Sequence, residues 1–171
     1  MTKKQLKKVK TGEISTNYDE VFQYLKDIDE LSRKVCKAKT KEDFLSLDQI
    51  EEALKVNVAF KLNRVAALQK EHYNVSKKDF VNSLFAADIV NMSQTHIKYV
   101  TFWTFRKRIE RGDIKCKGNL HNLTNLCKLY GLYQLHNDCK SCYECGYFQA
   151  GTAFSELILN AMKAVNLDLR P

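Results

Sequence analysis

One apolar stripe, repeated at intervals of three and four residues, most constrains how this chain can fold. It lies between residues 85 and 103 and consists of Phe85, Ile89, Met92, His96, Tyr99 and Trp103. Such spacing places all six side chains on one side of an α-helix. Helices with a face of this kind pack against other helices, as in an antiparallel bundle. The stripe therefore predicts a long helix whose internal core face it forms.

The rest of the chain favours the same class of structure. Its 171 residues include one proline and six glycines, so few positions interrupt a helix. Four further segments show helical periodicity: residues 18–36, 46–73, 118–135 and 154–165. No segment shows the sustained alternation of a strand. We predict an all-α fold, a helical bundle of about five helices.

Several residues mark where these helices begin and end. Ser46 and Gln49 have the spacing of a capping box, and Ser76 precedes another helix start with Asp79 in its first turn. Gly112 follows a run of cations and is a plausible helix stop. The segment between the first two helices is expected to place Phe44 and Leu45 on the core. The following helix, over 118–135, is expected to be formed by Leu120, Leu123, Leu126, Cys127, Tyr130 and Leu135, with Leu126 on its apolar surface.

The net charge of +8 is concentrated at one end of the chain. Five lysines in the first ten residues leave +3 for the remainder, which is an ordinary surface charge. We therefore predict a basic flexible arm over residues 1–16 and one helical domain over 17–171. No apolar run reaches the roughly 20 residues of a membrane span, and no secretory signal is expected. The six cysteines are accordingly interpreted as free thiols or ligands in a reducing compartment.

With the helices placed, the sequence resembles the C-terminal α-helical region of the peroxisomal acyl-CoA oxidases. The matching stretches are EEALKVNVAFKLNRVAALQKE (51–71), AADIVNMSQTHIKYVTFWTF (86–105), LCKLYGLYQL (126–135), GYFQAG (146–151) and, more weakly, LILNAMKAVNLDLRP (157–171). Residues 10–25 resemble the link between the two helical regions of that family. The resemblance covers nearly the whole chain.

This resemblance implies an FAD-dependent oxidase that introduces a trans-2 double bond into fatty acyl-CoA and releases hydrogen peroxide. It also implies a homodimer in the peroxisome, although residues 169–171 do not form a Ser-Lys-Leu type signal. The family's flavin-contacting domain and its glutamate base precede the region matched here. No catalytic, cofactor-binding or metal residue is therefore assigned, and the chain alone is predicted to be inactive and to hold no FAD. A fragment, a truncated gene model and a diverged stand-alone paralogue all stay open.

Cys139, Cys142 and Cys145, with His136 before them, suggest a different kind of protein. Four soft ligands spaced by three residues could make a stand-alone helical binding module stabilised by a metal. Zinc sites usually divide their ligands into two separated pairs, however, and residues three apart on a helix drift around its axis. Cys116 or His121 could complete such a site only through the fold. The favoured interpretation is a loop that carries thiols.

Other charged or polar groups have plainer interpretations. His96 is expected to bond a carbonyl or carboxylate at a helix interface, and His72 to act at a helix end. The carboxylates of the first helix, from Asp19 to Glu30, are expected to form a solvated face. Six cations between Arg106 and Lys117 could contact CoA phosphates or RNA, but a solvated helix end is favoured. Nucleic-acid binding through the basic arm is the weakest alternative.

The sequence also predicts where this domain would meet its neighbours. Its role in the larger enzyme is expected to be structural, packing against the catalytic domains or a second subunit. Tyr143, Tyr147 and Phe148 are the predicted exposed apolar residues for that contact.

Overall fold

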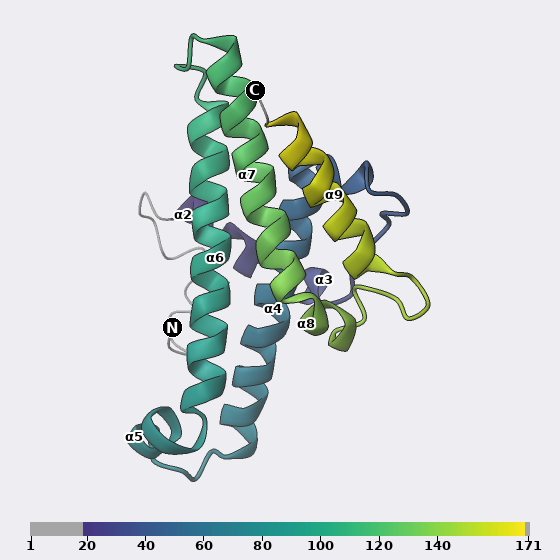
Figure 1. Ribbon diagram of the computed structural model, residues 1–171. Coiled ribbons are helices and arrows are strands. Elements are labelled where there is room, and N and C mark those ends of the chain that lie inside the picture. Colours follow the sequence, from purple (N-terminus) through teal and green to yellow (C-terminus); the bar gives the residue numbers. More distant parts are fainter. Residues whose placement is uncertain (1–18, 170–171) are drawn as a thin grey trace.

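The computed structural model describes residues 19–169, and within that range the chain forms helices and no strand. Its longest helices are α4 (Leu47–Glu71), α6 (Ala86–Glu110), α7 (Lys117–Asn137) and α9 (Phe154–Asp168). Figure 1 shows α4 and α6 as a long antiparallel hairpin, with α7 beside α6 and α9 on the other side of α7. The predicted all-α fold is confirmed. The predicted arm over residues 1–16 lies outside the described residues.

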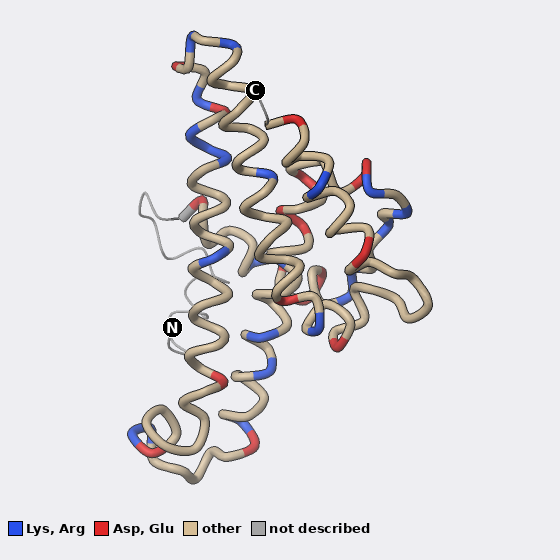
Figure 2. Tube along the Cα trace, viewed as in Figure 1, with Lys and Arg blue, Asp and Glu red and all other residues tan. Residues whose placement is uncertain are grey.

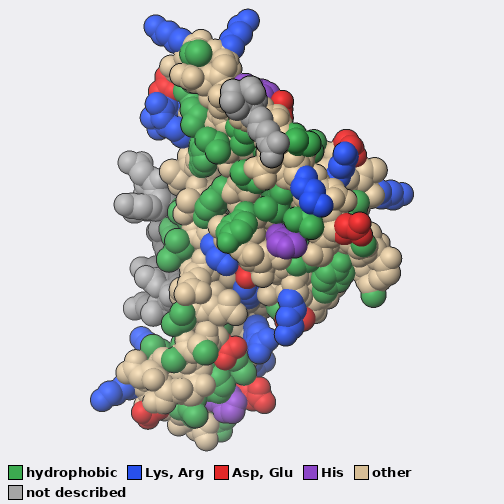
Figure 3. Space-filling model, in the orientation of Figure 1, with side chains coloured by type: hydrophobic (Ala, Val, Ile, Leu, Met, Phe, Trp, Pro, Cys, Tyr) green, Lys and Arg blue, Asp and Glu red, His purple; other side chains and the backbone are tan. Residues whose placement is uncertain are grey.

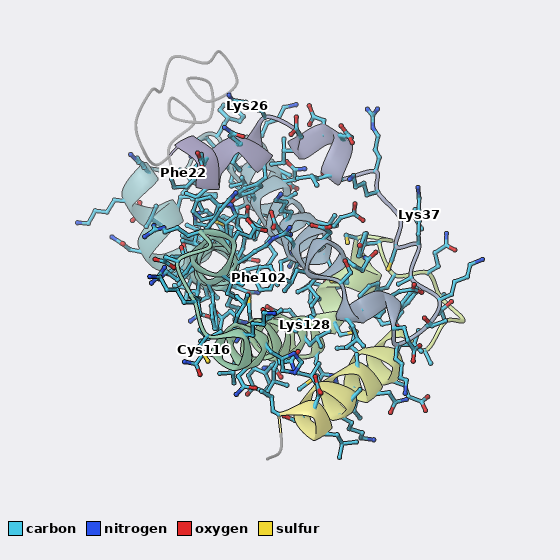
Figure 4. The ribbon with its side chains drawn as sticks, turned by 90° about the horizontal axis from the view of Figure 1, so that it is seen from above. Phe22, Lys26, Lys37, Phe102, Cys116 and Lys128 are labelled. Atoms are coloured by element: carbon cyan, nitrogen blue, oxygen red, sulfur yellow. The ribbon has the colours of Figure 1, made fainter. Side chains whose placement is uncertain are left out.

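The core forms where α4, α6, α7 and α9 meet. On α4 the apolar residues Ile50, Ala53, Leu54 and Val58 are buried at helical spacing, and Leu62 continues their face. Figure 4 looks down the bundle and shows Phe102 of α6 directed toward its interior. Burial of each large apolar side chain contributes about 1.5–3 kcal/mol. The periodicity of α4 was therefore sufficient to identify its core face over this length.

Gly131 of α7 allows the closest approach in the core. A Cβ atom at this position would lie 2.4 Å from Cγ2 of Ile50 and 2.7 Å from Cε2 of Phe102. Both neighbours are completely buried, so neither can move aside without disturbing other packed side chains. The missing side chain of Gly131 thus sets the distance between α7 and the α4–α6 hairpin.

The predicted core face of α6 is displaced around the helix. Thr95, Tyr99, Phe102 and Ile109 are its buried residues. In the predicted stripe only Tyr99 is among them; Ile89, Met92, His96 and Trp103 are half-buried, and Phe85 precedes the helix. The stripe is therefore internal only in part: Tyr99 is buried, and Met92 and Trp103 pack against the core from its edge. It marks a flank of α6 because the position of α4, which the sequence of α6 does not contain, decides which side is covered.

The first predicted helix, over residues 18–36, is replaced by three short pieces. These are α2 (Asp19–Phe22), the 3-10 turn η1 (Gln23–Leu25) and α3 (Ile28–Leu31). Asp27 interrupts the helical path with φ −101° and ψ 18°. The break allows Tyr24, Leu25, Ile28 and Leu31 all to be buried against the hairpin. Tertiary burial outweighs the local helical period here.

The short elements between the long helices test the predicted helix ends. Ser46 does precede α4, but its side chain makes no capping bond and the predicted capping box does not form. Gln49 instead donates to the hydroxyl of Tyr147 at 2.7 Å. The cap at Ser76 is confirmed, because its oxygen accepts the backbone N–H of Asp79 at 3.1 Å. Gly112 follows α6 with φ +77°, as expected for a glycine that ends a helix.

Three further short elements complete the described chain. The turn η2 (Asp43–Leu45) buries Phe44 completely, as predicted, while Leu45 is half-buried. Between α4 and α6 lie α5 (Lys77–Asp79) and the π-turn η3 (Phe80–Leu84). After α7 comes α8 (Cys139–Glu144), so the predicted cysteine loop is in fact a short helix.

Candidate interaction surface

The middle of α6 and the whole of α7 lack acidic residues. Neither α6 between Ile89 and Phe105 nor the whole of α7 contains an aspartate or glutamate. Figure 2 shows both helices largely free of charged residues along their middle, and Figure 3 shows hydrophobic side chains gathered along this face. A helix surface that stays in water normally carries both signs of charge. This face is therefore the leading candidate for contact with another protein surface.

The seam between the two helices is defined by a hydrogen bond and by helical spacing. The hydroxyl of Tyr130 on α7 donates to the carbonyl of Lys98 on α6 at 3.4 Å. The sides of the two helices that carry these residues therefore face each other. Gln94 and Thr101 lie one turn on either side of Lys98 on α6. Leu126 and Tyr133 flank Tyr130 in the same way on α7. We call the exposed residues along this line the α6–α7 seam: Val90, Gln94, Ile97, Thr101, Leu126 and Tyr133.

Leu126 was predicted on the apolar surface of this helix, and the structure shows that this part of the surface is exposed. Its side chain is 45 % exposed, whereas Cys127, Leu132 and Leu135, on other sides of α7, are buried. The apolar residues of α7 surround more than half of the helix, and α4 and α9 cover only part of it. The remaining apolar residues face outward.

A second apolar group lies at the tip of the α4–α6 hairpin. Tyr73, Val81 and Leu84 are exposed there, while the rings of His72, Phe80 and Phe85 pack against one another beneath them. Figure 1 shows this tip projecting well past α7 and α9. His72 ends α4, as predicted, and its ring lies 4.9 Å from that of Phe85. The formal charge of residues 70–88 is zero, because three lysines and three carboxylates lie in this range.

His96 connects α6 to the N-terminal segment. The hydroxyl of Tyr24 lies 2.7 Å from Nδ1 of His96, and the ring of Phe22 stacks on the imidazole at 5.3 Å. Burial lowers the pKa of His96. The histidine is interfacial, as predicted, but its partner is a tyrosine hydroxyl and not a carbonyl or carboxylate. Through these two contacts, His96 holds the segment 19–31 against the α4–α6 hairpin.

A polar groove of about 640 Å³ lies beneath that segment. Seven carboxylates line it, from Glu20, Asp27, Glu30, Asp48, Glu51, Glu52 and Glu110, together with four cations, from Lys34, Lys55, Arg106 and Lys107. The predicted acidic face of the first helix is exposed as expected at Glu20, Asp27, Asp29 and Glu30, and the side chain of Asp19 lies outside the described residues. The excess of carboxylates makes the groove unsuitable for an anionic ligand.

The three clustered cysteines are part of the core. Cys139 and Cys142 are buried on α8, and Cys145 is half-buried directly after it. Burial raises the pKa of each thiol, which disfavours the thiolate that a metal requires. Cys116 and His121 lie at the far end of α7, a helix of 21 residues and thus about 30 Å long. No cluster of metal-ligating side chains occurs within residues 19–169. The metal-stabilised module stays a prediction that this geometry does not favour.

Comparison with known proteins identifies the family to which this chain is related. The family model described as acyl-CoA oxidase matches residues 46–171. The chain belongs to the acyl-CoA oxidase family. Its fold is similar to that of Arabidopsis thaliana acyl-CoA oxidase 1, with a TM-score of 0.83 and 20 % identity, and to LeACX1, an acyl-CoA oxidase from tomato, with a TM-score of 0.84 and 21 % identity. A search of curated proteins gave no match.

These two oxidases are much longer than the present chain. Each alignment covers 98 % of this chain but 24 % of the plant enzyme. The chain therefore spans about a quarter of the length of these acyl-CoA oxidases. None of the helices within residues 19–169 is long and apolar enough to span a bilayer.

The cation cluster of this acyl-CoA oxidase domain is mostly paired. Arg106 binds Asp48, Glu51 and Glu110 at 2.6–2.9 Å, and Arg108 pairs with Asp113. Although partial burial opposes it, hydrogen bonding to Glu110 and Asp48 raises the pKa of Arg106. The prediction of a solvated helix end is correct for Arg111, Lys115 and Lys117, which are exposed, but not for Arg106. Pairing reduces the attraction of this cluster for phosphates.

The predicted contact residues of the acyl-CoA oxidase domain are wrong in two of three cases. Tyr147 and Phe148 are buried, and Tyr143 is half-buried. Phe148 stacks on Phe154 of α9 at 4.5 Å, and Tyr147 donates to Glu52 at 3.0 Å. These aromatic residues fasten the segment after α8 to the core.

One buried lysine, Lys61, was not among the residues predicted from the sequence. Lys61 is 6 % exposed and donates to Thr95 at 2.8 Å and Asn91 at 3.1 Å, with Asp138 at 3.5 Å. Asp138 also accepts from Lys98 at 2.9 Å. The available signal was the position of Lys61 on the core face of α4, one turn before Val65 and one turn after Asn57. This polar cluster joins α4, α6 and the end of α7.

Proposed function

We propose that this chain is the C-terminal helical domain of an FAD-dependent acyl-CoA oxidase-like flavoprotein, with a structural and interface role and no activity on its own. The larger enzyme would convert acyl-CoA to trans-2-enoyl-CoA and release hydrogen peroxide. The family match over residues 46–171 carries the proposal, supported by a fold alignment that includes nearly all of this chain and a quarter of each plant oxidase. Residues 17–171 would form the domain, with residues 1–16 as a basic arm.

The electrostatics of the polar groove beneath residues 19–31 argue against this groove as the binding site of the flavin or the acyl-CoA. FAD and CoA each carry a diphosphate, which needs cations or free backbone N–H groups. The 640 Å³ groove presents seven carboxylates against four cations, and Arg106 is already occupied by three of those carboxylates. This groove does not fit either group. When bound in the complete enzyme, FAD would accept the hydride from the substrate, and that chemistry would take place on other domains.

The contribution of this chain would then be a packed helical support. Its own core is complete, with Phe102, Leu132 and Ile158 fully buried, so it does not need a cofactor to fill its interior. The α6–α7 seam and the hairpin tip are the surfaces that would pack against the remaining domains or a second subunit. A peroxisomal homodimer is part of this proposal.

A chimeric oxidase tests the proposal. The quarter of Arabidopsis thaliana acyl-CoA oxidase 1 that aligns with this chain would be replaced by residues 19–171 of the chain. We expect the chimera to purify with flavin absorbance and with measurable peroxide release, while the isolated 171-residue chain shows neither. The intact plant enzyme and a version lacking that quarter serve as the two controls.

Two results would contradict the proposal. A chimera that is soluble but no better in flavin content than the deleted enzyme would show that the chain is not an equivalent domain. Stoichiometric flavin and peroxide release from the isolated chain would show that it is not merely structural.

A further inference from the structure

The polar groove beneath residues 19–31 carries negative charge that its own cations do not compensate. Its four cations are already bound by four of its carboxylates at 2.6–3.6 Å: Lys34 by Glu52, Lys55 by Glu51, Arg106 by Asp48, Glu51 and Glu110, and Lys107 by Glu110. The other three carboxylates, those of Glu20, Asp27 and Glu30, are exposed and form no ion pair with another described residue. A formal charge of −3 therefore remains in the groove.

The three uncompensated carboxylates belong to one wall of the groove. Together with Gln23, which also lines it, they follow one another along the segment 19–31 at intervals of three, four and three residues. Lys34 attracts two of them from a longer distance, but its ammonium group is bound to Glu52 at 2.8 Å. The wall is thus a row of acceptors that lacks its own donors.

Two aromatic side chains of α6 also line the groove. Tyr99 is only 1 % exposed, yet it borders the groove, and no other described residue makes a hydrogen bond with its hydroxyl. Burial and nearby Glu51 raise the pKa of Tyr99, so the hydroxyl stays neutral and able to accept a hydrogen bond. Trp103 lies one turn further along α6 and already has the ammonium of Lys107 5.8 Å from the centre of its ring. Carboxylates, a free hydroxyl and an aromatic ring together suit ammonium groups.

A matching set of ammonium groups occurs in the same chain, shortly before this wall. The first ten residues contain no aspartate or glutamate and include five lysines: Lys3, Lys4, Lys7, Lys8 and Lys10. Lys10 is ten positions from Glu20, a length of chain that spans about 33 Å when extended. A tether this short gives an effective concentration on the order of millimolar. Contacts that would be weak between separate molecules are therefore populated within one chain.

We propose that the lysine-rich segment 3–10 binds in this groove, against Glu20, Asp27 and Glu30. Complementary charge selects this occupant, because the segment has cations without acids and the wall has acids without cations. The bound segment would cover the outer side of residues 19–31, whose inner side is held against the hairpin by Tyr24 and His96. This inference concerns residues of this chain alone and does not depend on the proposed function.

Limited proteolysis of the full 171-residue chain tests this contact. Trypsin cleaves after lysine, and a bound segment is cleaved only in the fraction of molecules from which it has dissociated. Mass spectrometry would follow the first cleavage within residues 1–10 at about 0.02 M salt. Raising the salt to about 0.5 M should accelerate this cleavage, because exposed ion pairs are then screened.

Two matched variants locate the contact. The groove variant combines Glu20→Gln, Asp27→Asn and Glu30→Gln and should be cleaved about tenfold faster than the unmodified chain at low salt, since three exposed ion pairs are lost. The control variant makes the same change in net charge at exposed carboxylates outside the groove, with Glu42→Gln, Glu71→Gln and Glu144→Gln. Its cleavage rate should stay within about twofold. Circular dichroism confirms folding of both.

Trp103 provides a second readout, because it is the only tryptophan in the chain. Its fluorescence emission should shift between low and high salt in the unmodified chain. Replacement of the five lysines of segment 3–10 by glutamine should remove that shift while leaving the groove itself unchanged.

Three outcomes would overturn the inference. The first is equal cleavage of the unmodified chain and the groove variant, and the second is equal acceleration in both variants. The third is protection that depends on protein concentration and is accompanied by a salt-sensitive dimer in sedimentation, which would place the segment in the groove of a second copy.

Discussion

The two halves of the α4–α6 hairpin have similar sequence patterns and different surroundings. In the half near α7 and α9, α4 is buried through Leu62, and α6 is buried at Thr95, Tyr99 and Phe102. In the projecting half, Val65 is half-buried and Val90 is 52 % exposed, and beyond them the tip exposes Leu84. Helical periodicity continues through both halves, but only one has neighbours that cover it. An apolar stripe therefore identifies a face that requires a partner without identifying the partner.

The largest expected difference between the two halves is in the free energy of unfolding lost when an apolar side chain is truncated. Phe102→Ala should lower the free energy of unfolding by about 3–5 kcal/mol, because it leaves a cavity among completely buried residues. Leu84→Ala at the tip should change it by less than about 0.5 kcal/mol, since that side chain is already in water. Urea unfolding followed by circular dichroism measures both. Similar losses for the two variants would mean that the tip is covered in solution.

A second comparison concerns the buried ion pair at the boundary between the halves. Asp138→Ala should cost about 2 kcal/mol, because Lys61 is then buried without its carboxylate. Replacing Lys61 by Met in the same chain should recover part of this loss, since no buried charge is left unpaired. A double-mutant cycle by urea unfolding gives the coupling between the two positions. Strict additivity of the two changes would rule out their interaction.

The contact at Gly131 provides a smaller test of packing. Gly131→Ala should destabilise the protein by about 1–2 kcal/mol, because overlap with Ile50 and Phe102 exceeds the gain in helix propensity. Gly118→Ala, in the first turn of the same helix with no atom within 4 Å of the new Cβ, should be neutral or slightly stabilising. Thermal unfolding compares the two. A stabilising Gly131→Ala would show that α7 does not approach the hairpin this closely.

The smallest expected effect is the pH dependence of the contact that holds the N-terminal segment. Burial lowers the pKa of His96, so the folded protein binds this proton less readily than the unfolded chain, whose histidine titrates near 6.5. The stabilising contribution is present above that pH and is lost as the pH falls through about 6.5 toward the lower folded pKa. His96→Gln should reduce the drop in melting temperature between about pH 7.5 and 5.5. An unchanged pH profile in the variant would exclude His96 as its source.

The sequence was most reliable where the determinants of structure lie within a few residues of one another. The core face of α4, the cap at Ser76 and the helix stop at Gly112 each depend on local spacing or on one backbone conformation. The capping box at Ser46 failed because Gln49 has a stronger distant partner, Tyr147. Sequence spacing alone gave no indication of that bond, which joins residues 98 positions apart.

The candidate surface could be predicted only in part. The absence of carboxylates on α7 is visible in the sequence, but the exposure of Leu126 and the burial of Tyr147 and Phe148 are not. All three are apolar residues in or next to helices. Whether such a side chain is covered depends on which neighbouring element reaches it, and that is a property of the packed molecule.

By itself the sequence determined that this chain is helical and where its long helices run, because those features follow from composition and short-range periodicity. The family resemblance came instead from matching stretches of sequence in the same order along the chain. The tertiary structure decided which side of α6 is internal, how the first segment bends and which apolar residues stay outside. The physical reason is that hydrophobic burial has no preferred direction. A helix with apolar residues over much of its circumference can turn several faces inward, and only contacts with α4, α7 and α9 select one.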